Sequence, residues 1–291
     1  MTTMYEHQFV STNGITLHTV VAGPEKGPVV ILLHGFPEFW YGWRKQIPAL
    51  AAAGFRVWAP DQRGYNLSDK PRGLSAYRMD ELAADALGLI DATGQERVFL
   101  VGHDWGAMVA WSVALLAPER LRRLAILNVP HPAVMRRRLR TDPQQMRRSL
   151  YAAFFQLPGL PEAAVGAFGY RALARTLRES SRPGAFSDTD LDEYRRAWSR
   201  PGAMTSMLNW YRAALRRPVD DWPGPRVTVP TTIIWGMKDF ALRAVMAEES
   251  AALCDRGELL RLEDNTHWVQ HEAAAFVNET LITRFASAIQ T

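Results

Sequence analysis

Asp104 stands at the centre of residues 102–106 (GHDWG), between an apolar segment and an alanine-rich one. Small residues two positions either side of a central nucleophile suit a tight strand-to-helix turn, where larger side chains would clash. Serine is the usual central residue, but here it is aspartate. The helix that follows favours the charged form of this carboxylate. We therefore expect Asp104 to be a carboxylate nucleophile, although the five residues alone would equally suit a helix cap.

Two downstream loops supply an acid and a histidine. Asp239 follows the expected strand 231–235, and His267 follows the expected strand 258–262. Ligand sites in open parallel sheets form outside the carboxyl ends of the strands. The order nucleophile, acid, histidine matches the chain order of a catalytic triad on such a sheet. We therefore predict that Asp239 orients a catalytic His267, although a lone histidine is more often structural.

His271 lies four residues after His267, a spacing that can present two metal ligands on one helix face. No third ligand is close in the sequence, and no HExxH motif is present. We therefore predict no metal site and place His271 in the first turn of the last helix.

Residues 34–37 (HGFP) end an apolar strand, at the place where such a sheet supplies a donor to an oxyanion. We predict an oxyanion hole formed by the backbone N–H groups of Phe36 and Trp105. The alternative is a plain Gly-Pro turn. Residues 61–64 (DQRG) follow the next strand and are expected to form a structural ion pair and turn.

Strand and helix patterns alternate in the first and last parts of the chain. Residues 29–33 are apolar throughout, as expected of a strand buried on both faces, and residues 76–92 are amphipathic. This alternation predicts an α/β fold with a mostly parallel sheet covered by helices on both faces. The expected strands are 15–22, 28–33, 56–60, 97–101, 124–129, 231–235 and 258–262, and the expected helices are 43–53, 76–92, 107–116 and 271–286.

The alternation stops between about residues 130 and 225, where arginine-rich helical segments are broken at Pro-Gly pairs. We predict a core made of residues 1–133 and 223–291, interrupted by a helical insert of residues 134–222. Residues 222–225 (WPGP) resemble an exit linker.

Composition is that of an ordinary globular protein, with 47% hydrophobic and 22% charged residues. The longest apolar runs are strand-length, and no secretory signal is visible. A single cysteine, Cys254, excludes an internal disulfide and suits a reducing compartment. We therefore expect a cytoplasmic protein without a membrane span.

Arginine is concentrated in the insert, which holds 16 arginines against nine acidic residues. A basic face can bind nucleic acid or other anionic partners. Many of these arginines lie among acids at helical spacings, as in residues 188–196, which indicates a solvated helix face. We therefore predict no nucleic-acid partner.

Together these residues resemble the epoxide hydrolase branch of the α/β-hydrolase family. The resemblance covers nearly the whole chain, and the insert corresponds to the family's helical cap. One departure is Asn66, where the family usually has glycine, and it concerns loop shape more than chemistry. The matching motifs are 34–37, 61–65 (DQRGY), 102–106, 128–132 (NVPHP) and the loops of Asp239 and His267.

The resemblance also assigns two cap tyrosines. Residues 151–156 (YAAFFQ) and 208–212 (LNWYR) look like the segments that bear them, which places them at Tyr151 and Tyr211. In the family both phenols lie over the nucleophile and hold the epoxide oxygen. A tyrosine in a helical cap is otherwise usually a packing residue.

The implied reaction is conversion of an epoxide and water to a vicinal diol, without a cofactor. An ionised carboxylate attacks saturated carbon without prior deprotonation, which explains aspartate in place of serine. The phenols are protonated at neutral pH and can donate to the departing oxygen. The resulting ester on Asp104 would then be hydrolysed by water that His267 activates.

Two other functions stay open. A dehalogenase of the same fold also uses an aspartate, but Phe36 stands where haloalkane dehalogenases carry a polar halide donor, and Trp105 and Met108 stand where haloacetate dehalogenases carry arginines. A non-catalytic protein that binds a small ligand is the other alternative. Cap aromatics suggest a small apolar substrate, while its identity and the oligomeric state, a homodimer included, are not determined by the sequence.

Overall fold

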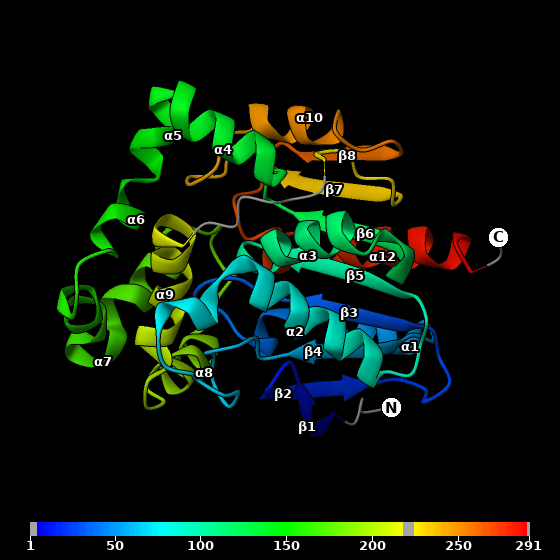
Figure 1. The fold of residues 1–291 in the computed structure, drawn as a ribbon, viewed down its shortest axis with the longest axis horizontal. Helices are drawn as coiled ribbons and strands as arrows, with labels where there is room; N and C mark the ends of the chain where they lie inside the picture. Colours follow the sequence, from blue (N-terminus) through cyan, green and yellow to red (C-terminus); the bar gives the residue numbers. More distant parts are fainter. Residues whose placement is uncertain (1–4, 218–223, 290–291) are drawn as a thin grey trace.

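An eight-stranded sheet in the order β1-β2-β4-β3-β5-β6-β7-β8 forms the centre of the protein (Figure 1). The computed structural model describes residues 5–217 and 224–289. β1 pairs antiparallel with β2, and β2 with β4, whereas the pairs from β4 to β8 are parallel. The strands are β1 (Glu6–Thr12), β2 (Ile15–Ala22), β3 (Val29–Leu33), β4 (Arg56–Pro60), β5 (Val98–His103), β6 (Leu121–Leu127), β7 (Thr231–Gly236) and β8 (Gly257–Leu262).

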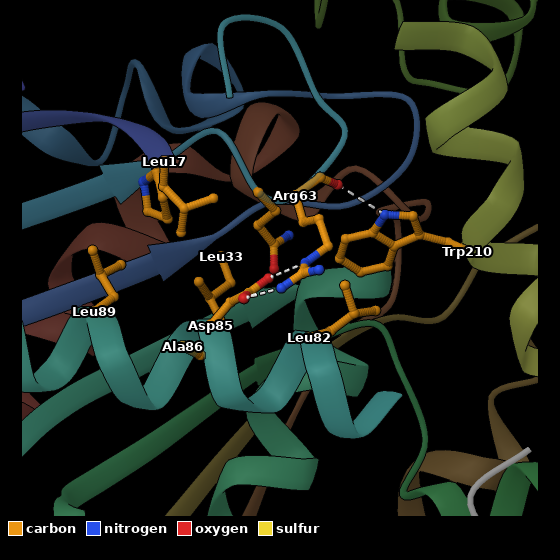
Figure 2. A pocket seen from close by; sticks show the side chains of 10 residues that line it. Leu17, Leu33, Arg63, Leu82, Asp85, Ala86, Leu89 and Trp210 are labelled. Atoms are coloured by element: carbon orange, nitrogen blue, oxygen red, sulfur yellow. Dashed lines mark hydrogen bonds and ion pairs between the residues drawn. The ribbon is translucent and has the colours of Figure 1, made fainter. Parts of the chain in front are cut away.

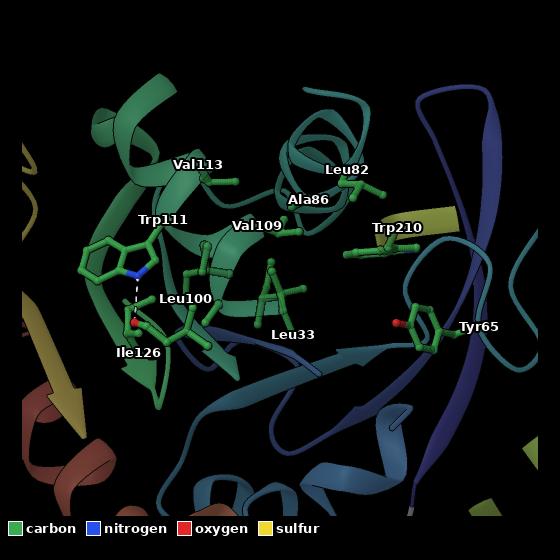
Figure 3. Packing of buried hydrophobic residues seen from close by; sticks show 14 of the residues in the cluster. Leu33, Tyr65, Leu82, Ala86, Leu100, Val109, Trp111, Val113, Ile126 and Trp210 are labelled. Carbon is green, nitrogen blue, oxygen red and sulfur yellow. Dashed lines mark hydrogen bonds between the residues drawn. The ribbon is translucent and has the colours of Figure 1, made fainter. Parts of the chain in front are cut away.

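Helices cover both faces because the central strands are apolar on both. In β3, Ile31 and Leu33 belong to the core shared with α2 and α3, whereas Val30 and Leu32 belong to the core shared with α1 and α12. Figure 3 shows the first of these cores, where Leu33 faces Val109 of α3. The helices that cover the sheet are α1 (Ile47–Ala52), α2 (Met79–Ala92), α3 (Trp105–Leu116), α10 (Val245–Ala251), α11 (Val269–Glu272) and α12 (Ala274–Ser287).

All seven predicted strands are present, with ends within three residues of the prediction, so the predicted α/β fold is confirmed. The antiparallel strand β1 was not predicted. The predicted helix 43–53 is wrong at its start: a 3-10 turn (Trp40–Trp43) precedes α1, which begins only at Ile47 beside Pro48. The predicted last helix is also divided, because Ala273, between α11 and α12, has the non-helical backbone angles φ −120° and ψ 40°.

Six helices separate β6 from β7, and the described residues between these strands contain no strand. The predicted start of the insert, residue 134, falls inside α4, which packs against α10 of the core. Trp222 and Pro223 of the predicted linker lie outside the described residues, so the division at 134–222 stays a prediction. The six helices are α4 (Pro132–Thr141), α5 (Pro143–Arg148), α6 (Leu150–Phe154), α7 (Leu160–Glu179), α8 (Asp188–Trp198) and α9 (Ala203–Arg216).

The insert covers the carboxyl ends of the parallel strands. Indole N–H groups of α8 and α9 donate hydrogen bonds to the core loops at this edge. Trp198 of α8 donates to the carbonyl oxygen of Pro37, just after β3. Trp210 of α9 donates to the carbonyl oxygen of Arg63, after β4, at 3.0 Å. We therefore call this insert the cap. Within the described ranges, no helix is both long and apolar enough to cross a membrane.

A buried ion pair supports the loop after β4. Arg63 donates to both carboxylate oxygens of Asp85 in α2, at 2.7 and 2.6 Å, beside the indole of Trp210 (Figure 2). The predicted structural role of Arg63 is thus confirmed, although its partner lies in α2. The adjoining cavity of about 10 Å³ can hold no more than one water molecule. It is therefore a packing defect and not a substrate site.

Replacing Asp85 with alanine should lower the free energy of unfolding by about 3–5 kcal/mol, because buried Arg63 would lose both of its hydrogen bonds to Asp85 and keep only the carboxylate of Glu81, 3.8 Å away. Burial raises the pKa of Asp85 even beside Arg63, which marks the cost of holding charge there. Urea unfolding measures the effect. The control is Asp91→Ala, which breaks an exposed pair with Arg120 and should cost no more than about 1 kcal/mol. Equal losses in the two variants would contradict the prediction.

Candidate active site

Asp104 occupies a strained turn between β5 and α3. Its backbone has φ 49° and ψ −124°, a conformation that L-residues rarely adopt. A Cβ on Gly102 would lie 2.6 Å from the Cα of Ala107, and one on Gly106 would overlap the carbonyl oxygen of Leu33. Both glycines are therefore required by close backbone approach, as the spacing predicts. The turn presents the Asp104 side chain, which is 19% exposed, at the carboxyl edge of the sheet.

The loop after β3 contacts the same carboxylate. The backbone N–H of Phe36 donates to Oδ1 of Asp104 at 2.6 Å. A Cβ on Gly35 would overlap the side chain of Asp104, so only glycine lets this loop come so close. The structure thus places one of the two predicted oxyanion donors on the carboxylate. The role of the Trp105 N–H stays a prediction.

Asp239 and His267 come together beside Asp104. The Nδ1 of His267 lies 2.7 Å from Oδ2 of Asp239, and its Nε2 lies 3.5 Å from Oδ2 of Asp104. Asp239 and His267 are 4% and 3% exposed, so water screens these charges little. The three predicted triad residues therefore form one connected, largely buried group.

Asn128, after β6, holds the acid in place. Its Nδ2 donates to Oδ2 of Asp239 at 2.8 Å, and its Oδ1 accepts from the backbone N–H of Gly236 at 2.9 Å. The other oxygen of Asp239 accepts the N–H groups of Ala241 and Leu242, both at 2.8 Å. Asn128 was noted in sequence only as part of a family motif. Asn128 has φ 51°, and nothing in the sequence around it indicates that it would hold Asp239.

Burial and charge act in opposite directions on the triad. Burial alone would raise the pKa of Asp104, but contact with His267 and the Phe36 N–H holds it below its ordinary value. Burial alone would lower the pKa of His267, but the carboxylates of Asp239 and Asp104 raise it to about 10. The resting group at neutral pH is therefore an imidazolium between two carboxylates.

Tyr211 and Tyr151 lie over this group from the cap. The ring of Tyr211 packs edge-on against Trp105, with centroids 4.9 Å apart, and against Phe36 at 5.3 Å. Tyr151 lies 5.9 Å from Tyr211. Burial and the negative charge of Asp104 raise the pKa of both phenols, which are therefore protonated at neutral pH. The structure brings both predicted tyrosines to the candidate site.

A second buried polar group, around Glu38, adjoins the triad and was not predicted. Glu38 is 1% exposed and accepts hydrogen bonds from Tyr194 of α8 at 2.6 Å and Gln270 at 2.9 Å. It also lies 2.6 Å from Nε2 of His271. His103 connects this group to the triad, because its Nε2 lies 2.9 Å from the carbonyl oxygen of His267.

Three other positions singled out in the sequence, His271, Asp61 and Asn66, have local contacts or backbone angles that indicate structural roles. His271 is in α11, not in the last helix as expected, and Glu38 occupies one ring nitrogen. Asp61 contacts His18 at 2.6 Å and accepts from the Asn66 side chain at 2.8 Å. Asn66 itself has φ 38°, so it adopts a left-handed conformation, which favours glycine but which asparagine also tolerates.

The chain matches the family model of the alpha/beta hydrolase fold over residues 28–274. It is 48% identical to an AB hydrolase superfamily protein of Bacillus subtilis, covering 94% of this chain and 96% of that protein. It is 36% identical to epoxide hydrolase A of Mycobacterium tuberculosis, covering 94% and 95%.

Solved structures of epoxide hydrolases are also similar to this chain. An epoxide hydrolase from Bacillus megaterium in complex with an inhibitor superposes with a TM-score of 0.85 at 30% identity, covering 98% of this chain and all of that one. Epoxide hydrolase A from Mycobacterium thermoresistibile gives 0.83 at 33% identity, covering 96% and 98%. This chain therefore belongs to the α/β-hydrolase fold family.

Replacing Asp104 with asparagine should lower the pKa of His267 below about 10, because one of the two carboxylates that raise it is removed. The ion pair stabilises the fold fully below pH 6.5, the ordinary histidine value, and this contribution is lost as pH rises through about 10. NMR titration of the histidines measures the shift. His131, whose pKa burial lowers to about 4, is an internal control that should not change. A His267 that titrates identically in both proteins would contradict this assignment.

Proposed function

We propose that this chain is an epoxide hydrolase, which converts an epoxide and water to a vicinal diol through an ester on Asp104. The observation that carries the proposal is a carboxylate, in place of a hydroxyl, at the turn with φ 49°, 3.5 Å from the Nε2 of His267. Relatives and solved structures named as epoxide hydrolases support the substrate class.

In the first step Oδ2 of Asp104 attacks an epoxide carbon, and the bond from that carbon to the ring oxygen breaks. Oδ1 is already occupied by the Phe36 N–H, which leaves Oδ2 as the attacking atom. Tyr151 or Tyr211 gives its proton to the departing oxygen. General acid assistance of this kind accelerates reactions by about 10²- to 10⁴-fold.

Once Asp104 is esterified, His267 gives up its resting proton, which returns through solvent to the phenolate left by the first step. In the second step water attacks the carbonyl carbon of the ester, and the neutral His267 takes a proton from that water. Oδ1, now the carbonyl oxygen, becomes the oxyanion, and the N–H groups of Phe36 and Trp105 stabilise it. The bond from the carbonyl carbon to the diol oxygen then breaks, and the diol oxygen takes the remaining proton of the attacking water. This restores the carboxylate of Asp104 beside a protonated His267. Asp239 keeps the imidazole in the required orientation.

Replacing His267 with glutamine should stop the second step and leave the first, so the ester should accumulate. After mixing with an epoxide, mass spectrometry of the intact protein should show a gain equal to the whole epoxide. The double variant Asp104→Asn, His267→Gln is the control and should gain nothing. With a halogenated substrate, a gain smaller by one hydrogen halide would instead assign dehalogenation. No adduct and no turnover across a broad epoxide panel would favour a binding protein.

Replacing Tyr151 and Tyr211 together with phenylalanine should slow ester formation by about 10²- to 10⁴-fold, because the departing oxygen would lose its proton donors. Rapid-quench kinetics with single turnovers measures this step. Tyr170→Phe is the matched control, since Tyr170 is a cap tyrosine that packs on Trp198. An unchanged rate in the double variant would remove the phenols from the mechanism.

A further inference from the structure

Exposed apolar side chains are concentrated on one part of the cap. Leu150 is 63% exposed, Leu160 54%, and Phe154 38%. Scattered single apolar residues are normal on a protein surface, but a contiguous group of them indicates a binding surface. We call this group the α5–α6 surface. Its members are Met146, Leu150, Tyr151, Phe154, Leu157 and Leu160.

Helical spacing places most of this surface on one side. Met146, Leu150 and Phe154 are separated by four residues each, the spacing of neighbours on a helix face, and Leu157 lies in the bend after α6. Only Ser149 separates α5 from α6, so the two helices follow each other closely. Gln145 points the other way and donates to the carbonyl oxygen of Ala241 in the core. Figure 1 shows α5 and α6 along the outer margin of the protein, away from the sheet.

The same segment is strongly basic. Residues 132–160 contain six arginines and one acidic residue, Asp142, which is buried and paired with Arg243. Some of these arginines have carboxylate partners, as in the pair of Arg138 with Glu249. Among the described residues, no ion pair is formed by the exposed side chains of Arg136, Arg140 and Arg147.

We propose that the α5–α6 surface docks peripherally on a membrane that contains anionic lipids. The segment of residues 132–160 thus combines exposed apolar residues with exposed arginines that form no ion pair among the described residues. This combination matches a lipid interface, where apolar side chains enter the acyl chains and arginines bind the headgroup phosphates. A nucleic acid would leave the leucines unburied. A two-fold contact between copies would bring arginines against arginines.

Docking would also place the candidate site near the lipid. Tyr151 belongs to the surface, being 43% exposed, and its ring is 5.9 Å from that of Tyr211. An apolar substrate concentrates in a bilayer, so the phenols would meet it there. This last link rests on the proposed function, whereas the docking itself does not.

The test is co-sedimentation of the full chain with sucrose-loaded vesicles, without any substrate. Vesicles of phosphatidylcholine with phosphatidylglycerol should bind the protein at low salt and release it at high salt. Pure phosphatidylcholine vesicles should bind it weakly. Leu150→Ser with Leu157→Ser should lower the partition coefficient by about tenfold or more. Arg136, Arg140 and Arg147, all changed to glutamine, should lower it and remove most of its salt dependence.

Matched controls come from the far end of the sheet. Leu116→Ser, at a side chain 42% exposed at the end of α3, and Arg256→Gln, before β8, should leave binding unchanged. Circular dichroism and urea unfolding establish that each variant is folded. Absent binding, equal binding to both lipids, or binding unaffected by the α5–α6 variants would overturn the proposal. A dimer in light scattering that Leu150→Ser with Leu157→Ser dissolves would assign the surface to a second copy instead. Because no substrate is present, these outcomes are independent of whether epoxides react.

Discussion

Close approach of three backbone segments around Asp104 is the constraint on which the rest of the site depends. The turn after β5 crosses the end of β3 so closely that Gly106 has no room for a side chain. The loop after β3 brings Gly35 into close contact with the side chain of Asp104. This contact brings the Phe36 N–H to within 2.6 Å of the carboxylate. The unfavourable φ of Asp104 persists because the packing of β3, β5 and α3 leaves no alternative path for the chain.

The charge states of Asp104 and His267 depend on this placement. A carboxylate moved from water into a largely buried site would ordinarily take up a proton. Here it stays charged because His267 and the Phe36 N–H offset the loss of water. In the resting state His267 is protonated and cannot accept a proton. In the proposed reaction, esterification removes the charge of Asp104 and with it part of what raises the pKa of His267. The base would therefore form at the point in the cycle where it is needed.

Short-range signals accounted for most of the fold. The apolar run of β3 and the glycines around Asp104 are local in sequence, so they predicted the parallel strands and the turn. β1 was missed because it is a largely exposed edge strand, although Asn13 and Gly14, both at positive φ, are a hairpin signal before β2. The Glu38 group was missed for a different reason. Tyr194 lies 156 residues away in sequence, and Gln270 lies 232 away, so only the tertiary fold brings them to Glu38.

The segments that carry the two cap tyrosines contact different loops of the core. Tyr211 follows Trp210, whose indole is bonded to the loop after β4. Tyr151 follows Arg148, whose side chain donates to the carbonyl oxygen of Asp239 at 2.9 Å. One phenol is therefore tied to the loop that carries the acid of the triad. The two phenols are also linked to each other, because Arg212, next to Tyr211, donates to the carbonyl oxygens of Phe155 and Leu157. A shift of residues 239–241 would therefore be transmitted to both phenols.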